Sequence, residues 1–416
     1  MRYTNRGIVV LISEIVRNKS ISSWIIYDVA NTVFNAGVVG LFMPLWITGE
    51  KGGNDGDLGF PVALAMLIVF LLSPFLGALN DHVHNRKGLL FGLNVTVVIA
   101  TFMIGVFDSL SVGLLFFCVA FIALNLAELI YNSLLVEVST EKTRGKIGGI
   151  GIGFGYLGAI LIVGFGLYIE YAGITYAFGF KIAAVIVLVM ALPITLFLRD
   201  SRPDDSRSEK VSIFQATRIQ LQQTFSYFQE YPFIRKFFVA RYFYMVTAMS
   251  LSTFAVLYGT ETVGFTPTKI QLVLLVGIIV AIPGAVMWGY IVDRIGAKMT
   301  LGWVLFGWLI SLIGAVSIPW LGLTKDLWWL ISVVIGICYG GIWAADRPFL
   351  IALSPKYLGE MFGIYSATSR ASFFTGSFLW PFIAVTLGFG QPAAVLVLMF
   401  FTVIGVILLM RLPQRV

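Results

Sequence analysis

The sequence predicts an all-α polytopic membrane protein of twelve transmembrane helices in two six-helix bundles. The chain is 58% hydrophobic and only 12% charged, whereas a soluble domain has about 25% charged residues. Twelve apolar runs are each long enough to cross the hydrocarbon of a bilayer, which takes about 20 residues in a helix. Lys and Arg gather between alternate runs, as they do where a chain crosses a membrane repeatedly.

Six runs precede the one long polar stretch of the chain, and six follow it. The predicted spans are residues 24–48, 60–80, 88–107, 110–136, 147–168 and 174–198, then 237–260, 270–292, 299–319, 327–352, 361–387 and 392–412. Residues 1–21 form a cytoplasmic lead-in. Residues 22–198 and 237–412 form the two bundles, joined by a linker at 199–236.

The linker has a charged first part and a second part with apolar residues at helical spacing. Those apolar residues are Phe214, Leu221, Phe225 and Phe228. Such spacing predicts an amphipathic helix lying on the inner membrane surface. A solvated loop is the alternative.

The basic residues give the orientation of the spans. With the N-terminus inside, 22 of the 28 Lys and Arg residues lie in inner segments, and the outer loops hold only Lys51, Lys269 and Lys325. Both termini are therefore expected to be cytoplasmic, in a cell (inner) membrane. This distribution also explains the net charge of +7 without a nucleic-acid partner.

Two loops repeat one pattern. Gly-x3-Asp-x4-basic occurs between spans 2 and 3 and again between spans 8 and 9, and all three positions are shifted by the same offset in the numbering. The residues are Gly77, Asp81 and Arg86, and Gly289, Asp293 and Lys298. Duplicated halves are typical of transporters, and these six residues are predicted to control conformational exchange.

These loops resemble the signature of the major facilitator superfamily. Other segments resemble its vacuole-effluxer-like family, namely Trp24-x2-Tyr27-Asp28-x-Ala30-Asn31, Tyr131-Asn132-Ser133-Leu134-Leu135, the glycine-rich 148–158, Gly340-Gly341-x2-Ala344-x2-Arg347 and Met361-Phe362-Gly363-Ile364-Tyr365. The resemblance implies the major facilitator fold, and it points to amino-acid export, the activity of fungal members.

One segment departs from the family pattern. Where Gln-x-x-Ser-Arg-Ser is expected, the chain has Trp343-Ala344-Ala345-Asp346-Arg347-Pro348. Trp343 is a candidate substrate contact, and a change here would alter the substrate. Asp346 and Arg347 are expected near the cytosol as gating residues or as simple orientation anchors.

Three predicted spans carry polar stripes at helical spacing, and each stripe includes an ionisable residue. They are Asp28, Asn31, Thr32 and Asn35 in span 1, Asn125, Glu128, Tyr131 and Asn132 in span 4, and Ser366, Ser369, Arg370 and Ser377 in span 11. Charges inside a membrane need a partner or a function. Arg370 is predicted to pair with Glu128 or Asp28 in the empty cavity and to hold the carboxylate of a zwitterionic solute. A purely structural ion pair or cap is the alternative for both carboxylates, and Arg241, near the start of span 7, is expected at the interface.

The sequence contains neither a phosphate-binding loop nor a nucleophile–base set, so neither ATP-driven transport nor an enzyme is predicted. No cofactor and no structural metal are expected, and the driving ion is H⁺ or Na⁺. We therefore expect a monomeric secondary active transporter in the lipid bilayer that exports a small-molecule solute by alternating access. The alternatives are a proton-coupled exporter of amphipathic or xenobiotic compounds and a non-transporting membrane sensor or scaffold.

Overall fold

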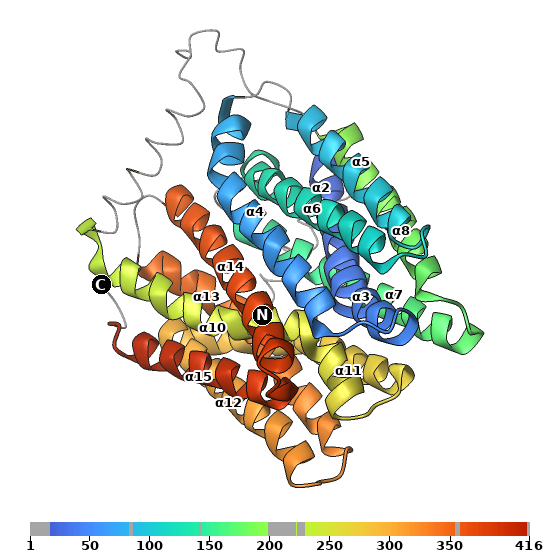
Figure 1. Ribbon diagram of the computed structural model, residues 1–416. Coiled ribbons are helices and arrows are strands. Elements are labelled where there is room, and N and C mark those ends of the chain that lie inside the picture. Colours follow the sequence, from blue (N-terminus) through green and yellow to red (C-terminus); the bar gives the residue numbers. More distant parts are fainter. Residues whose placement is uncertain are drawn as a thin grey trace. The chain divides into compact units, whose positions relative to one another are not determined.

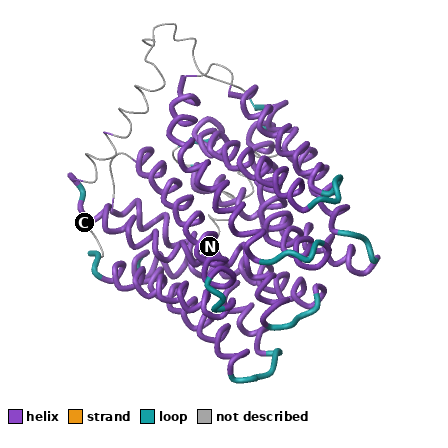
Figure 2. Tube along the Cα trace, viewed as in Figure 1, coloured by secondary structure: helices purple, strands orange, loops and turns teal. Residues whose placement is uncertain are grey.

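A computed structural model of the chain describes residues 17–82, 86–140, 143–198, 222, 229–353 and 358–413. In these ranges the chain consists of helices joined by short loops, without any strand (Figures 1 and 2). The residues that predict an amphipathic linker helix lie outside these ranges.

Six predicted spans of the first half are helical. Their elements are α2 (Lys19–Thr32) continued by η1 (Val33–Phe42), α3 (Met43–Leu45) and η2 (Trp46–Glu50), then α4 (Asp55–His82), α5 (Arg86–Ile104), α6 (Leu110–Val138), α7 (Arg144–Ala172) and α8 (Tyr176–Phe197). The η segments are π-helical, so helix 1 runs from α2 to η2 without a break.

The six spans of the second half are helical as well. They are α10 (Pro232–Leu257) continued by η3 (Tyr258–Thr262), α11 (Pro267–Ile295), α12 (Ala297–Trp320), α13 (Leu327–Leu353), α14 (Leu358–Pro381) continued by η4 (Phe382–Thr386), and α15 (Gly390–Met410). The prediction of twelve helices is confirmed.

Eleven helical segments of the described residues are long and apolar enough to cross a membrane. The remaining predicted span is α14 with η4, which carries Arg370 and many Ser and Thr residues and is more polar than the others. A polar helix is tolerated in a membrane when its polar groups face other helices or water. We therefore read α14 as an internal span.

The contacts divide the chain into two compact units, which are described separately. The first comprises Met1–Val38, Phe75–Ile162 and Ala177–Thr217, and the second comprises Val39–Pro74, Val163–Tyr176 and Arg218–Val416. In the first, α6 packs against α5 and α2. In the second, α13 packs against α11 and α12, and α15 packs against α10 and α12 (Figure 1). Their boundaries run within helices, so the division at the linker stays a prediction.

Helix ends follow local sequence signals. Asn18 caps α2, since its side chain accepts from the backbone N–H of Ser20 at 3.0 Å. Thr266 caps α11, which begins with Pro267, the residue best suited to a first helical position. Gly296 ends α11 with a φ of 86°, a conformation that costs little only for glycine.

Three helices end alike, namely helix 1, helix 7 (α10 with η3) and helix 11 (α14 with η4). In each, the first carbonyl of the last π-helical turn accepts from the amide that follows the turn, and a glycine of positive φ comes next. The amide-to-carbonyl pairs are Lys51 to Trp46, Val263 to Tyr258 and Leu387 to Phe382, and the glycines are Gly52 (64°), Gly264 (70°) and Gly388 (70°). Gly52 and Gly264 are related by the offset that separates Gly77 from Gly289, as are the starts of α4 and α11. The offset of the loop motif therefore extends to the backbone.

Replacing Gly52 by alanine should destabilise the fold. The φ of 64° at Gly52 forces a side chain into the left-handed region, which costs about 1 kcal/mol. Gly49→Ala is the matched control, because it lies in η2 and a Cβ at either position meets nothing within 4 Å. Thermal unfolding in detergent should give a lower Tm for Gly52→Ala than for Gly49→Ala, and equal values would contradict the assignment.

Candidate functional site

A carboxylate and three aromatic rings meet in the first unit. Asp28 lies on α2, and its Oδ1 accepts from the hydroxyl of Tyr131 on α6 at 3.4 Å. The Tyr131 ring stacks on Trp24, with centroids 4.7 Å apart and planes at 13°, and the centroid of the Tyr27 ring also lies 4.7 Å from that of Tyr131. Aromatic faces beside a carboxylate form an environment that favours an organic cation.

A row of glycines on α7 makes room for this group. A Cβ on Gly155 would lie 2.7 Å from both Oδ2 of Asp28 and Oγ1 of Thr32, and one on Gly151 would lie 2.9 Å from the Trp24 ring. The backbone of α7 therefore passes directly beside the carboxylate. Glycines in membrane helices permit such close approach, so this face of α7 positions α2 within the first unit.

Amide side chains in the same unit have unused hydrogen-bonding capacity. Asn94 accepts from the Tyr27 hydroxyl at 2.7 Å, while its Nδ2 and the Oδ1 of Asn31 are buried without a partner among the described residues. Asn125 uses its Nδ2 on the Phe121 carbonyl at 2.9 Å. A buried amide atom without a partner is costly, which makes Asn31 and Asn94 candidates for solute contacts.

The other predicted residues of these two helices lie at different degrees of exposure. Glu128 is half-buried, whereas Asn132 and Asn35 are exposed. Asn35 donates to the carbonyl of Asn31 at 3.0 Å. The structure thus brings Asp28 and Tyr131 together, and a role for the remaining residues in binding stays a prediction.

The basic residues of the repeated loop motif anchor helix ends. Arg86 donates to Oε1 of Glu137, at the end of α6, over 2.6 Å. Lys298 donates to the carbonyl of Met410, at the end of α15, at 2.9 Å. A cation at this end of a helix also interacts favourably with the helix dipole. Asp293 is exposed, whereas the surroundings of Gly77 and the side chain of Asp81 lie outside the described part.

A fully enclosed ion pair lies in the second unit. Arg241 on α10 and Asp346 on α13 are both 0% exposed, and Nε of Arg241 donates to Oδ2 of Asp346 at 2.9 Å. The Asp346 carboxylate also accepts from the hydroxyls of Tyr244 at 2.5 Å and Tyr365 at 2.9 Å. Arg241 further donates to the Tyr365 carbonyl and to Ser369, both at 2.9 Å. The pair therefore joins α10, α13 and α14.

This cluster corrects one expectation from the sequence. The prediction that Arg241 lies at the membrane interface is wrong, because the side chain is completely buried and its guanidinium carbon lies 3.5 Å from the centre of the Tyr365 ring. The signal was present in the sequence as charged residues inside spans 7 and 10. Periodicity within one helix does not reveal which charges on separate helices meet.

The last predicted residues lie on α13 and α14. Arg370 is buried on α14, with 7% of its surface exposed. Its predicted partners belong to the first unit, so the pairing stays a prediction. Trp343 and Arg347 are half-buried on α13, with the guanidinium 5.9 Å from the Trp343 ring centre.

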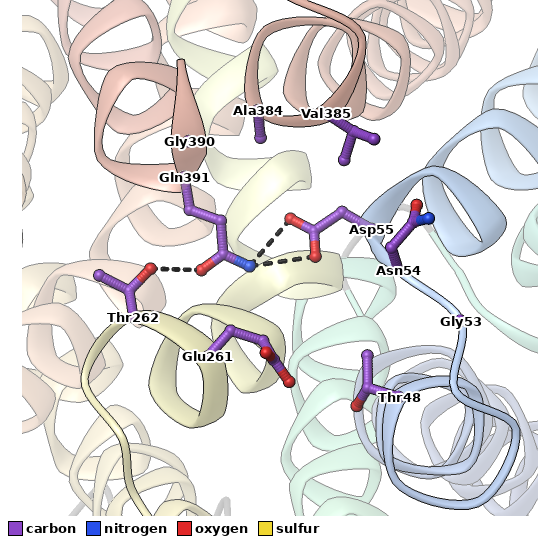
Figure 3. A pocket seen from close by; sticks show the side chains of 10 residues that line it. All are labelled: Thr48, Gly53, Asn54, Asp55, Glu261, Thr262, Ala384, Val385, Gly390 and Gln391. Carbon is purple, nitrogen blue, oxygen red and sulfur yellow. Dashed lines mark hydrogen bonds between the residues drawn. The ribbon is translucent and has the colours of Figure 1, made fainter. Parts of the chain in front are cut away.

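The second unit contains a polar cavity of about 270 Å³ at the helix ends predicted to face outside. Its walls come from the ends of helices 1, 7 and 11 and the starts of α4 and α15 (Figure 3). The lining residues are Thr48, Gly53, Asn54, Asp55, Glu261, Thr262, Ala384, Val385, Gly390 and Gln391. The sequence did not single out this group, because its residues are scattered among loops and helix ends.

Comparison with known families decides the relationship. Residues 60–415 match the family described as vacuole effluxer Atg22 like, which is well over half of the chain. The chain belongs to the vacuole effluxer Atg22-like family. The resemblance seen in the sequence is therefore confirmed, and the protein is a multi-pass membrane transporter of the major facilitator type.

Individual relatives agree with this family. The chain is 25% identical over 418 residues to an uncharacterized MFS-type transporter, YxiO of Bacillus subtilis, covering 95% of each chain. It is 24% identical over 356 residues to the quinolone resistance protein NorA of Staphylococcus aureus, covering 84% of each.

Solved structures share the fold. A mutant of the nucleoside transporter NupG matches with a TM-score of 0.72 at 14% identity, over 95% of this chain and 100% of that one. A bacterial homologue of the human lysosomal transporter Spinster matches with a TM-score of 0.68 at 13% identity, over 94% and 95%. At these identities the likeness shows the fold alone.

The Arg241–Asp346 pair should behave as one energetic unit in this effluxer-like chain. Removing one partner of a buried pair costs about 3–5 kcal/mol, because the other charge stays buried. Arg241→Gln and Asp346→Asn should each lower the Tm strongly, and the double variant should lose less than the sum. Arg347→Gln is the control next in sequence and should change the Tm little. Additive losses in thermal unfolding would show that the two residues act independently.

Proposed function

We propose that this transporter exports a small zwitterionic solute, such as an amino acid, across a cell membrane by ion-coupled alternating access, with both termini cytoplasmic. The observation that carries the proposal is the carboxylate–aromatic group of Asp28, Trp24, Tyr27 and Tyr131. An ammonium group binds well to a carboxylate flanked by aromatic faces. The family relationship supports transport, and the resemblance to amino-acid exporters supports this class of solute.

Arg370 would read the acidic group of the solute. It is a buried guanidinium on α14, the most polar of the predicted spans. A guanidinium presents a planar pair of donors that matches a carboxylate. In this proposal Glu128 carries the coupling ion, since it is a half-buried carboxylate one helical turn from Tyr131. Asn31 and Asn94, each with an amide atom that has no partner in the described part of the chain, add polar contacts.

A second candidate is export of amphipathic or xenobiotic compounds. The similarity to the quinolone resistance protein NorA favours it. The three rings around Asp28 suit an aromatic amine as well as a small ammonium group. The two candidates differ in whether the solute needs an acidic group.

Counterflow in proteoliposomes tests the function directly. Purified protein would be assayed with a panel of amino acids, amphipathic amines and quinolones, with and without a pH or sodium gradient. Amino-acid exchange that is accelerated by one gradient supports the proposal. Exchange of amphipathic compounds alone selects the second candidate, and exchange of neither contradicts both.

Asp28→Asn should weaken transport of any solute that carries an ammonium group. The substitution keeps the shape of the side chain and removes the charge that balances the ammonium, so the KM should rise at least about tenfold, equivalent to about 1.4 kcal/mol. Asp108→Asn is the matched control, because it removes the same charge at an exposed position just before α6, and it should leave the KM close to that of the parent. An unchanged KM in Asp28→Asn would remove Asp28 from solute binding.

A further inference from the structure

One carboxylate from the first half of the chain binds helices of the second half at the predicted outer helix ends. Asp55 is the first residue of α4, and 5% of its surface is exposed. Its Oδ2 accepts from Nε1 of Trp380 on α14 at 2.6 Å and from Nε2 of Gln391 on α15 at 2.9 Å. Oδ1 accepts from the same amide at 3.0 Å (Figure 3). These three bonds tie α4 to two other helices of the second unit.

The donors are themselves held in place. Oγ1 of Thr262 donates to Oε1 of Gln391 at 2.5 Å, which turns the NH₂ end of that amide towards Asp55 (Figure 3). The Trp380 ring stacks on Phe254, with centroids 4.9 Å apart and planes at 4°. Both N–H groups are therefore directed at the carboxylate by contacts of their own.

The helices touch closely beside these bonds. A Cβ on Gly59 of α4 would lie 2.6 Å from the Pro381 ring and 2.8 Å from the carbonyl of Ser377, both on α14. The two helices are therefore in direct contact one turn into α4. The hydrogen bonds of Asp55 lie just beyond Gly59. Together with the Gly59 contact they form what we call the joint between α4, α14 and α15.

Among the described residues, no cation bonds to the buried carboxylate. The bonding partners of Asp55 are neutral, and the charged side chains among the residues that line the cavity are Asp55 and Glu261, both acidic. Figure 3 shows the Glu261 carboxylate pointing into the same cavity. A proton on Asp55 would replace an acceptor by an O–H donor that faces two N–H donors. Loss of the charge therefore weakens the joint.

Asp55 is not required to start the helix. The equivalent helix of the second half, at the offset of the loop motif, starts at Pro267 and is capped by Thr266. A carboxylate at this place in the repeat is thus dispensable for helix formation. Because this carboxylate is present in one half alone, we assign its role to the contacts with α14 and α15.

The cavity beside Asp55 is built from three π-helical turns. Thr48 belongs to η2, Glu261 and Thr262 to η3, and Ala384 and Val385 to η4. Turns of this kind are uncommon and are often found at functional sites. Three of them converge on one cavity in the described part of this unit.

We propose that Asp55 is a proton-binding site that controls closure of the outer helix ends. As a carboxylate it holds α4 to α14 and α15, and when protonated it releases them, so that protons outside favour opening. The proposal rests on the predicted topology for its sidedness and on the family's transport activity for its use. It does not depend on the identity of the solute.

Access of a thiol reagent to the packed joint tests the proposal. Ser377 is fully buried and lies one helical turn inward of Trp380, so Ser377→Cys reports opening. The two native thiols, Cys118 and Cys338, would be replaced by serine in the full chain. A membrane-impermeant methanethiosulfonate cation would be added outside intact cells, and the modification rate measured.

The variants separate the charge of Asp55 from a general effect at this helix end. Asp55→Asn removes the charge and should raise the modification rate about 3- to 10-fold, as loss of a buried hydrogen bond implies. Thr262→Val frees the Gln391 amide and should raise it less. Asp57→Asn is the matched control, because Asp57 also lies in the first turn of α4 and its Oδ2 accepts from the Asn54 backbone amide at 2.9 Å. Asp57→Asn should not change the rate.

Acid should have the same effect as Asp55→Asn. At each pH, the modification rate of the parent is divided by that of Asp55→Asn, which cancels the ionisation of the thiol itself. Lowering the outside pH from about 8 to about 5, across the usual range of buried carboxylates, should raise this ratio. Equal rates in the parent, Asp55→Asn and Thr262→Val would overturn the proposal, as would an equal increase in Asp57→Asn or a pH response that persists in Asp55→Asn. If Asp55→Asn does not fold, Thr262→Val and the pH response decide.

Discussion

The cost of an uncompensated charge in hydrocarbon governs how the polar residues of this chain are arranged. A charge within a span must be paired, hydrogen-bonded or functional. Arg241 and Asp346 show the first solution, since the hydrogen bonds they make in the described residues close one network across three helices. Asp55 shows the second, a carboxylate held by side-chain N–H donors. Asp28 lies beside aromatic rings and accepts a 3.4 Å hydrogen bond from Tyr131, an arrangement that suits contact with a charged solute.

The two halves share their backbone repeat but differ in chemistry. Helices 1 and 7 end in the same π-helical turn at the same offset as the loop motif. At that offset Asp28 corresponds to Ala240, and Arg241 corresponds to Val29. The repeat therefore fixes where helices begin and end, whereas each half places its charges independently. The first half places a carboxylate, Asp28, among aromatic rings, whereas the second half encloses the Arg241–Asp346 ion pair completely.

The sequence predicted those features that depend on one helix at a time. Runs of mostly apolar residues marked the twelve helices, including the more polar α14, because such a run is a local signal. The loop motif located the repeat, and the polar stripes of spans 1 and 4 included Asp28 and Tyr131, which the structure brings together. Sequence reasoning did not find the Arg241–Asp346 pair or the Asp55 joint, whose members are far apart in the sequence. Which helices meet is a property of tertiary packing, and no local period encodes it.

Recognition of the solute is proposed to rest on Asp28 and Arg370, each of which binds the opposite charge on it. Equilibrium binding to the purified protein of an amino acid, its N-acetyl derivative and its methyl ester tests this most directly. The acetyl group removes the ammonium charge and the ester removes the carboxylate, with little change elsewhere. The free amino acid should bind, and each blocked form should lose at least about tenfold in affinity, since each lacks one charge-assisted contact. Equal affinity for the N-acetyl derivative would contradict the claim for Asp28, and equal affinity for all three would contradict it entirely.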